Sequence, residues 1–336
     1  MAKYIGSSPS ITNSGASGIF NLNQIAEQIN QAVWPSADAV SADYLVIGGG
    51  GGGGSDNAGG GGAGGLVWNK NQSLNKNTLI NIQVGSGGTG APSSAGSSSG
   101  ARGSSGDNSF LQYDTADSAD FITVGFGGGG GASGQSGGDP AGPGGSGGGG
   151  QGENGGTSEA AILTQNGAIA TQPTSIYGGF GNDGGYGYRL GGTNQGGGGG
   201  GGGAGNSGGG GGAASAGRAG GGFNCDITGT SIPYAGGGGG ANENNKTTWF
   251  YGGTDTAGQG GRSSNSAKHA DANFGDGGGG ASYNSSTWYA GGNGGSGIVI
   301  IRTLATASAT TGSPTVDSDG LGYNVYSYTG SGSITF

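Results

Sequence analysis

Long runs of glycine constrain this chain more than any other feature. Of its 336 residues, 96 are glycine. The longest runs cover residues 48–54, 59–62, 127–131, 147–150, 196–203, 208–212, 236–240 and 277–280. Ordering a glycine costs roughly 0.5–1 kcal/mol more than ordering an alanine, because glycine loses more backbone freedom. Such runs therefore form either a flexible linker or a packed structure that requires the absence of side chains.

The composition favours the packed structure. Charged residues make up only 9% of the chain, and it contains 13 Tyr, 9 Phe and 4 Trp. Disordered chains carry few aromatic residues and much more charge. The runs lack a strict three-residue period and there are only 8 prolines, which excludes collagen.

A packing mode for glycine follows from backbone geometry. In the extended left-handed conformation with three residues per turn, N–H and C=O groups point outward and need partners on other segments. A Cβ inside such a bundle would push the neighbouring segments apart. We therefore predict a polyglycine II helix bundle. Its scaffold glycines include Gly48, Gly51, Gly129, Gly199, Gly210, Gly238 and Gly278.

Apolar runs bracket the glycine-rich region. Residues 44–47 (YLVI) and 297–302 (GIVIIR) are continuous and typical of strands buried on both faces. We expect these two strands to pair or to lie together, closing the domain with a small β-sheet. Residues 78–84 alternate like a half-buried strand. The predicted fold class is thus mostly irregular and β, a polyglycine II bundle framed by short strands.

The two ends of the chain differ from its middle. Apolar residues at spacings of three and four predict a short α-helix at 21–33 that serves attachment or oligomerisation, or that caps the body. Its apolar face is formed by Leu22, Ile25, Ile29 and Val33. Residues 323–336 predict a β-hairpin that turns at 330–332. The expected domains are an N-terminal segment (1–42), a glycine-rich domain (43–304) and a C-terminal linker with the hairpin (305–336).

Several function classes are disfavoured. The net charge is −9 and the 10 basic residues are scattered, so no nucleic-acid partner is expected. The longest apolar run is too short for membrane insertion, and no signal peptide is visible. Cys225 and His269 are single residues of their kind and the carboxylates show no ligand spacing. We predict no enzyme activity, no metal and no cofactor.

Aromatic residues between the glycine runs are the candidate functional residues. Their rings offer large contact areas at low entropic cost, which suits recognition of proteins or glycans. The alternative is that they cover the glycine segments and shield their edges. The candidates are Trp249, Phe250, Tyr251, Trp288, Tyr289, Tyr177, Phe180, Tyr186 and Tyr188.

Several motifs resemble the glycine-rich domain of tailed-bacteriophage tail-fibre and tail-tip adhesins. They are YLVIGGGGGGG at 44–54, GGGGAGGL at 59–66, NIQVGSGGTG at 81–90, GGGGGA at 127–132 and 236–241, and GGSGIVIIR at 294–302. The lead at 16–35 and the end of the chain are similar to segments of phage structural proteins. In the T-even-like adhesins, glycine motifs form a polyglycine II sandwich whose loops bind the host receptor. The N-terminal part departs from that family, which leaves the anchoring partner open.

The resemblance implies a virion protein that is made in the host cytoplasm and displays receptor-binding loops. Its expected partners are other virion proteins, reached through the N-terminal segment, and a bacterial surface protein or glycan; a homotrimer is plausible for such a fibre. One alternative is a fibre, decoration or connector subunit without a receptor role. A third hypothesis, an ice-binding protein, predicts a strict three-residue repeat that this sequence lacks.

Overall fold

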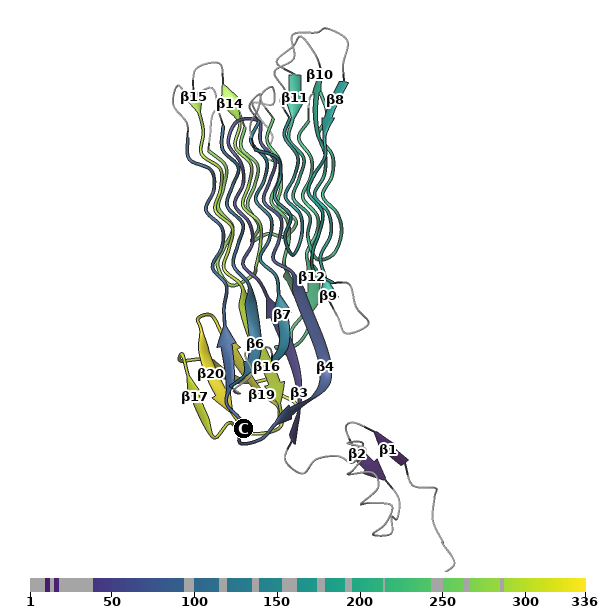
Figure 1. Ribbon diagram of the computed structural model, residues 1–336, viewed down its shortest axis with the longest axis vertical. Coiled ribbons are helices and arrows are strands. Elements are labelled where there is room, and N and C mark those ends of the chain that lie inside the picture. The colour runs from purple at the N-terminus through teal and green to yellow at the C-terminus, as the bar shows by residue number, and fades with distance from the viewer. Residues whose placement is uncertain are drawn as a thin grey trace, which may run out of the picture.

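The computed structural model describes most of the chain. The described residues are 10–12, 15–17, 39–93, 100–114, 120–134, 139–152, 162–173, 179–190, 195–213, 215–242, 250–262, 266–284 and 287–336. Glycine segments run along the long axis of the molecule, with the two largest sheets at one end (Figure 1). We call these two sheets the sheet region and the glycine segments the glycine body.

Two antiparallel sheets form the sheet region. In spatial order, the six-stranded sheet contains β18 (Thr315–Ser318), β19 (Asn324–Tyr328), β16 (Ile298–Thr303), β3 (Ala39–Ile47), β4 (Leu66–Asn75) and β9 (Gly179–Phe180). The five-stranded sheet contains β17 (Ala309–Thr311), β20 (Gly332–Thr335), β5 (Ile80–Gln83), β6 (Ser109–Tyr113) and β7 (Phe121–Gly125). Strands from both ends of the chain therefore share these sheets.

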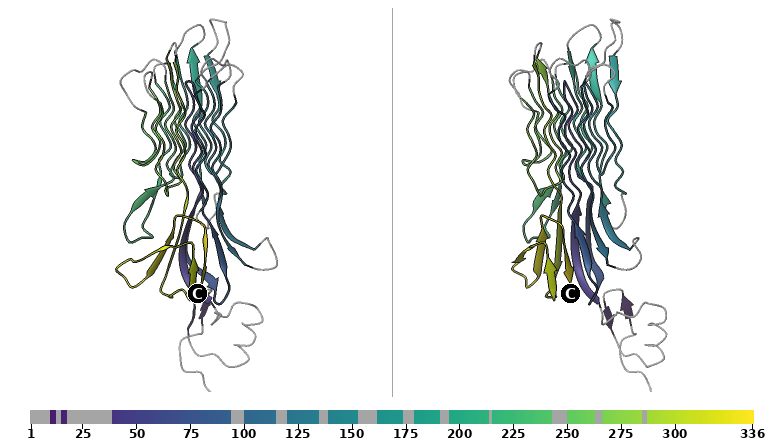
Figure 2. Two further views of the ribbon diagram at one scale, coloured as in Figure 1. Left: turned by 90° about the vertical axis from the view of Figure 1, so that its left-hand side faces the viewer. Right: turned by 60° about the vertical axis from the view of Figure 1, so that its left-hand side comes forward.

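Small sheets complete the described strands. Near the far end of the glycine body lie β8, β10 and β11, and the hairpin of β14 and β15 (Figures 1 and 2). Their bounds are β8 Ile162–Gln165, β10 Gly187–Leu190, β11 Gln195–Gly197, β14 Tyr283–Asn284 and β15 Thr287–Trp288. Two further hairpins are β1 (Ser10–Thr12) with β2 (Gly15–Ser17), and β12 (Phe223–Cys225) with β13 (Ile232–Tyr234).

The central pair of the six-stranded sheet is the pair that the apolar runs predict. Strand β3 pairs with β16 in an antiparallel register that runs from Ile47 opposite Ile298 to Ala42 opposite Thr303. Alternate side chains point to opposite faces, and both faces are buried. The predicted pairing of these two strands is confirmed.

Two apolar clusters cover the two faces of that pair. One fills the space between the two large sheets and includes Val46, Leu111, Ile301 and Tyr328. The other lies on the opposite face, where Leu45 and Ile300 pack with residues of the β12–β13 hairpin. Continuous rather than alternating apolar runs are therefore required in β3 and β16.

Residues 48–55 show how the segments of the glycine body pair. Every third N–H group of this segment donates to the same neighbouring segment, so its N–H groups bond to three segments in turn. Its carbonyl oxygens accept hydrogen bonds from three other segments. The acceptors are 59–65, 101–107 and 292–295, and the donors are 88–91, 128–134 and 278–281. The N···O distances are 2.8–3.1 Å. A strand within a sheet pairs with two neighbours, whereas this segment pairs with six.

The close approach of these segments explains why they are glycine. A Cβ on Gly51 would fall within 3.0 Å of the backbone of residues 128 and 129. Equivalent backbone atoms crowd Gly53 and Gly238. Side chains would force the segments apart and break hydrogen bonds in several directions at once.

The predicted fold class is wrong. The described residues contain no helix and are about 31% strand in sheets. The backbone N–H and C=O groups of the glycine segments form hydrogen bonds to other segments. The strands are also longer than the short ones predicted to frame the bundle, since β4 has ten residues. The predicted α-helix at 21–33, with Leu22, Ile25, Ile29 and Val33, lies outside the described residues.

The predicted C-terminal hairpin is also wrong. Strands β19 and β20 occupy 324–328 and 332–335, but they belong to different sheets. The chain crosses from one sheet to the other between them, so the two strands contact each other through side chains. The Tyr328 hydroxyl donates to the Ser333 carbonyl oxygen at 2.9 Å inside the core. The physical reason is burial of apolar side chains from both strands between the two sheets.

Candidate functional site

The end of the glycine body opposite the sheet region carries the short strands β8, β10, β11, β14 and β15 and described turns between glycine segments (Figures 1 and 2). One of them, at Ser55–Asn57, is almost fully buried, and Asp56 and Asn57 have positive φ angles of 69° and 47°. The Ser55 hydroxyl donates to the carbonyl oxygen of Ala101 at 3.3 Å and accepts its N–H at 3.0 Å. This turn is buried inside the glycine body, so a partner would contact the segments that surround it rather than the turn itself.

Two of the predicted aromatic residues are strongly exposed. Tyr251 is 69% exposed and Tyr186 is 48% exposed. The ring of Tyr186 lies over Gly210, where an added Cβ would meet its ring carbons. Tyr186 therefore covers a glycine segment and presents the rest of its ring to solvent, which combines the two roles that the sequence leaves open.

The other predicted aromatic residues do not form one site with these two. Phe180, in β9, stacks on Phe223 with ring centroids 4.2 Å apart and packs against the second apolar cluster. Phe250 is 9% exposed and bridges to Gly260. Tyr188 and Tyr289 are half-buried.

Three candidates have little or no description in the structure. Trp288 pairs with Tyr283 across the β14–β15 hairpin, and only its backbone is described. Trp249 and Tyr177 lie outside the described residues. The structure therefore leaves Tyr186 and Tyr251 as the exposed described members of the predicted set.

The predicted scaffold glycines all lie in close contacts. A Cβ at six of them would collide with backbone atoms of a neighbouring segment, and at the seventh, Gly210, with the Tyr186 ring. The six are Gly48, Gly51, Gly129, Gly199, Gly238 and Gly278.

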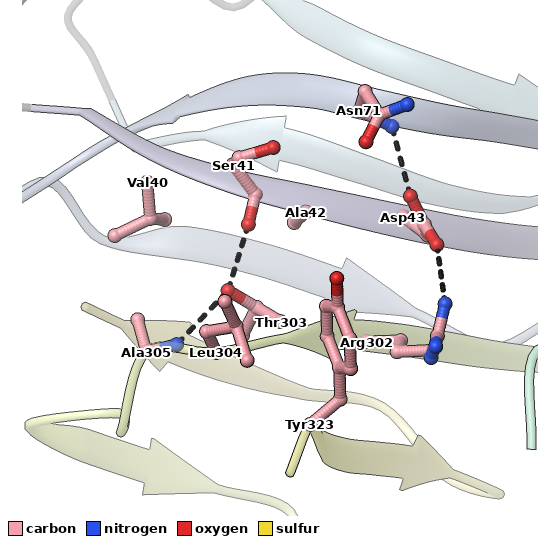
Figure 3. Close-up of a pocket in the computed structure, with 10 residues that line it drawn as sticks. All are labelled: Val40, Ser41, Ala42, Asp43, Asn71, Arg302, Thr303, Leu304, Ala305 and Tyr323. Carbon is pink, nitrogen blue, oxygen red and sulfur yellow. Dashed lines mark hydrogen bonds and ion pairs between the residues drawn. The ribbon is translucent and has the colours of Figure 1, made fainter. Parts of the chain in front are cut away.

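Sequence reasoning missed a charged cluster in the sheet region (Figure 3). Arg302 bonds to Asp43 at 2.8 Å and to Asp319 at 2.7 and 2.9 Å. Its guanidinium lies 4.0 Å from the centroid of the Tyr323 ring. Asp43, Arg302 and Tyr323 line a cavity of about 240 Å³. A signal was available, because Asp43 and Arg302 flank the two apolar runs and sit opposite each other in the register.

The charged groups in this cluster attract one another, with one guanidinium between two carboxylates. Burial disfavours the ionised form of Asp319, but the Arg302 guanidinium and the N–H groups of Leu321 and Tyr323 outweigh it and lower the pKa of the carboxyl. The Asp43 carboxylate also accepts the N–H of Asn71 at 2.8 Å. The cluster ties β3 to β16 and to the turn after β18, and its charges are engaged in that contact.

A buried carboxyl lies inside the glycine body. Asp276 is 0% exposed and accepts bonds from the Gly236 N–H at 2.6 Å and from the hydroxyls of Thr254 and Thr256 at 2.9 and 2.5 Å. Burial raises the pKa of Asp276 to about 7, although these three donors oppose the shift. The carboxyl joins three segments of the body.

The remaining candidates for chemistry are isolated. Burial raises the pKa of the Cys225 thiol to about 12, so this thiol stays protonated at neutral pH. The His269 Nδ1 accepts the N–H of Asn293 at 2.8 Å. In the part of the chain that the structure describes, no group of three or more His, Cys, Asp or Glu side chains could hold a metal ion. No described helix could cross a bilayer.

Comparison with known proteins adds one finding. The sequence matches no curated protein. A family model described as a glycine-rich domain matches residues 27–304, which is more than half of the chain. That match includes strands β3 and β16, the glycine body and all seven scaffold glycines. By this extent the chain belongs to the glycine-rich domain family.

Proposed function

We propose that this chain is a virion structural protein of a tailed bacteriophage, a tail-fibre or tail-tip subunit. It presents host-receptor-binding loops from the glycine body, and it acts by binding rather than by catalysis. Its site of action is the phage tail or surface fibre, after synthesis in the host cytoplasm. The partners are other virion proteins and a bacterial surface protein or glycan, and a homotrimer fits such a fibre.

The separation of the two ends of the molecule carries this proposal. The sheet region gathers strands from residues 39–83, 109–125, 179–180 and 298–335. At the opposite end lie the short strands β8, β10, β11, β14 and β15, together with turns such as the one at Ser55–Asn57 (Figure 1). A body held by backbone bonds in several directions is stiff, so it keeps the loops at a distance from the sheet region. Rigid scaffolds that hold variable loops are a common basis for recognition.

The N-terminal segment, 1–42, provides the attachment to the rest of the virion in this proposal. Strand β3 begins at Ala39 in the sheet region. An attachment element that precedes it would fix the sheet region to the virion and leave the turns of the glycine body facing outward.

One observation favours a second function, a fibre, decoration or connector subunit without receptor binding. Phe180 and Phe250 are buried or packed against other rings, and Tyr186 covers Gly210. These residues serve packing, so aromatic side chains between glycine runs are not by themselves evidence for recognition. The two functions differ in whether the exposed aromatic loops bind cells.

A cell-binding experiment separates the two. We would replace residues 243–249 with a Gly/Ser segment of equal length and combine this with Tyr251→Ser, then measure binding of the labelled full chain to a panel of bacterial strains. We expect the variant to lose binding to the strain that the wild-type protein recognises, with an unchanged melting temperature. The loss follows because aromatic rings contribute much of the energy of recognition surfaces.

Leu321→Ser is the matched control. Leu321 is 75% exposed and lies in the sheet region, in the turn between β18 and β19. This change removes an exposed apolar side chain of similar accessibility without touching the loops. Undiminished cell binding by the loop variant would rule out these loops as the receptor-binding surface and favour the connector function.

A further inference from the structure

The outer face of the five-stranded sheet contains a hollow of about 500 Å³. Strands β6 and β7 lie side by side here, next to the glycine body (Figure 1). Ile82 and Leu111 point into the core between the sheets, so the neighbouring residues Gln83 and Phe110 point outward. The size lies in the range of about 300–1,000 Å³ that is typical of small-ligand sites.

Aromatic rings form the floor of the hollow. Phe110 and Phe121 meet edge to face, with centroids 5.1 Å apart and ring planes at 86°. Val124 and Phe126 extend the apolar surface. Phe121 is 48% exposed, although it lies on a sheet that already has a filled core on its other face. The ring therefore packs on Phe110 and leaves about half of its surface open to solvent.

Polar side chains with fixed positions form the wall. The Asn108 Oδ1 accepts the N–H of Gly127 at 2.8 Å, which turns its NH₂ group away from that bond. Asp107 accepts a hydrogen bond from the Ser86 hydroxyl through one oxygen. The Gln83 amide donates to the Asn108 carbonyl oxygen at 3.4 Å. Among the described residues, the Asn108 NH₂, the Asp107 Oδ1 and the Gln83 Oε1 have no further hydrogen-bond partner.

The lining excludes two other kinds of ligand. It contains one carboxylate and, among the described residues, no Lys, Arg or His, so it does not suit phosphates or other anions. An extended peptide would add to the free edge of β7. The Gln172 side chain already occupies that edge, because it accepts the Phe126 N–H at 2.9 Å and donates to the Val124 carbonyl oxygen at 3.2 Å.

We propose that this hollow binds a pyranose ring of a neutral glycan. The apolar C–H face of a pyranose carries partial positive charge and packs on the negative face of an aromatic ring, here Phe121. Its hydroxyl groups both donate and accept hydrogen bonds, which matches the mixture of amide and carboxylate groups on the wall. Because those groups are already held in place, binding costs little side-chain entropy. The site is separate from the loops of the proposed function and does not depend on it.

The test is saturation-transfer NMR on the full chain with methyl glycosides of glucose, galactose, mannose and N-acetylglucosamine as probes. We expect at least one probe to show saturation transfer at millimolar concentration. Phe121→Ser should weaken its affinity by about tenfold or more, which corresponds to about 1.4 kcal/mol. Asn108→Asp keeps the acceptor for Gly127 but removes the NH₂ donors, and it should weaken binding similarly.

Tyr251→Ser is the matched control, since Tyr251 is another exposed aromatic residue but lies in the glycine body. It should bind the probe as the wild type does. If Phe121→Ser lowers the melting temperature, the glycoside affinity of the Asn108→Asp variant serves as the test instead. The proposal is overturned if none of the glycosides binds, if Phe121→Ser and Asn108→Asp bind normally, or if only Tyr251→Ser loses binding. The last result would place glycan recognition in the loops and leave the proposed function intact.

Discussion

The sheet region and the glycine body are stabilised in opposite ways. In the sheet region, large side chains such as Leu111, Ile301 and Tyr328 fill the space between two sheets. In the glycine body, segments approach so closely that a single Cβ has no space. An interior strand of a sheet pairs with two neighbours, whereas residues 48–55 pair with six segments.

This difference shows that one chain uses two kinds of interior. The sheet region gains free energy from removing apolar side chains from water, at roughly 25 cal/mol per Å². The glycine body lacks such side chains and relies on satisfied backbone hydrogen bonds and close backbone contacts. The sheet region should therefore be sensitive to lost volume, and the glycine body to added volume.

The largest expected effect comes from adding one methyl group to the centre of the glycine body. In Gly51→Ala, the new Cβ would collide with Gly128 and Gly129, whose backbone atoms cannot rotate away. Overpacking usually costs 1–3 kcal/mol; here we expect a loss of more than about 3 kcal/mol in the free energy of unfolding. Urea denaturation followed by circular dichroism measures this loss.

Two other glycines provide graded controls. A Cβ on Gly209 would lie 3.3 Å from Arg218 backbone atoms, and one on Gly221 would lie 3.4 Å from the Asn206 Oδ1. Alanine at Gly209 should cost less than at Gly51, and at Gly221 it should cost almost nothing. Equal losses at all three positions would contradict the idea that close packing, rather than glycine content as such, holds the body together.

The next largest effect should come from removing volume from the sheet region. Leu111 is fully buried between the sheets, so Leu111→Ala leaves a cavity and should cost about 3 kcal/mol. The same urea experiment measures it. A loss below about 1 kcal/mol would show that backbone pairing dominates in the sheet region as well, and the contrast between the two regions would disappear.

Much of the sheet region was predictable from the sequence, because burial on both faces leaves continuous apolar runs in β3 and β16. The C-terminal strands illustrate the limit. Residues 323–336 look like a hairpin from their local pattern, yet β19 and β20 enter different sheets. Local alternation indicates a strand but does not identify its partner, which depends on long-range packing.

The candidate site was less predictable. The sequence identifies aromatic residues between glycine runs, but it cannot distinguish Tyr251, which is exposed, from Phe250, its buried neighbour. The hollow around Phe121 depends on β5, β6 and β7 lying in one sheet. Its polar residues, such as Gln83 and Asn108, carry no motif, so only the fold brings them together.

The smallest expected effect is a pH dependence of stability that arises in the glycine body. Asp276 places a carboxyl inside the glycine body, where most contacts are made by the backbone. Its folded-state pKa of about 7 lies above the ordinary value of 3.8, because burial favours the neutral acid. Its stabilising contribution is therefore complete below about pH 4 and is lost as the pH rises through 7. Between pH 5 and pH 8, the protein should lose about 2 kcal/mol of stability from this group.

Asp276→Asn tests this directly, because the amide stays neutral and keeps an oxygen that accepts the Gly236 N–H. The difference in unfolding free energy between wild type and variant should change by about 2 kcal/mol between pH 5 and pH 8, with the variant relatively more stable at pH 8. Asp271→Asn is the control, because Asp271 is exposed and raises the pKa of Asp276 through charge repulsion. Removing the Asp271 charge should lower the pH midpoint of the Asp276 effect slightly and retain the pH dependence of stability. A wild-type protein whose stability follows that of Asp276→Asn at every pH would mean that the three donors hold the carboxylate ionised. The glycine body would then accept a buried charge although it cannot accept a methyl group. Hydrogen bonds can stabilise a buried charge, but they cannot create the space that a methyl group needs.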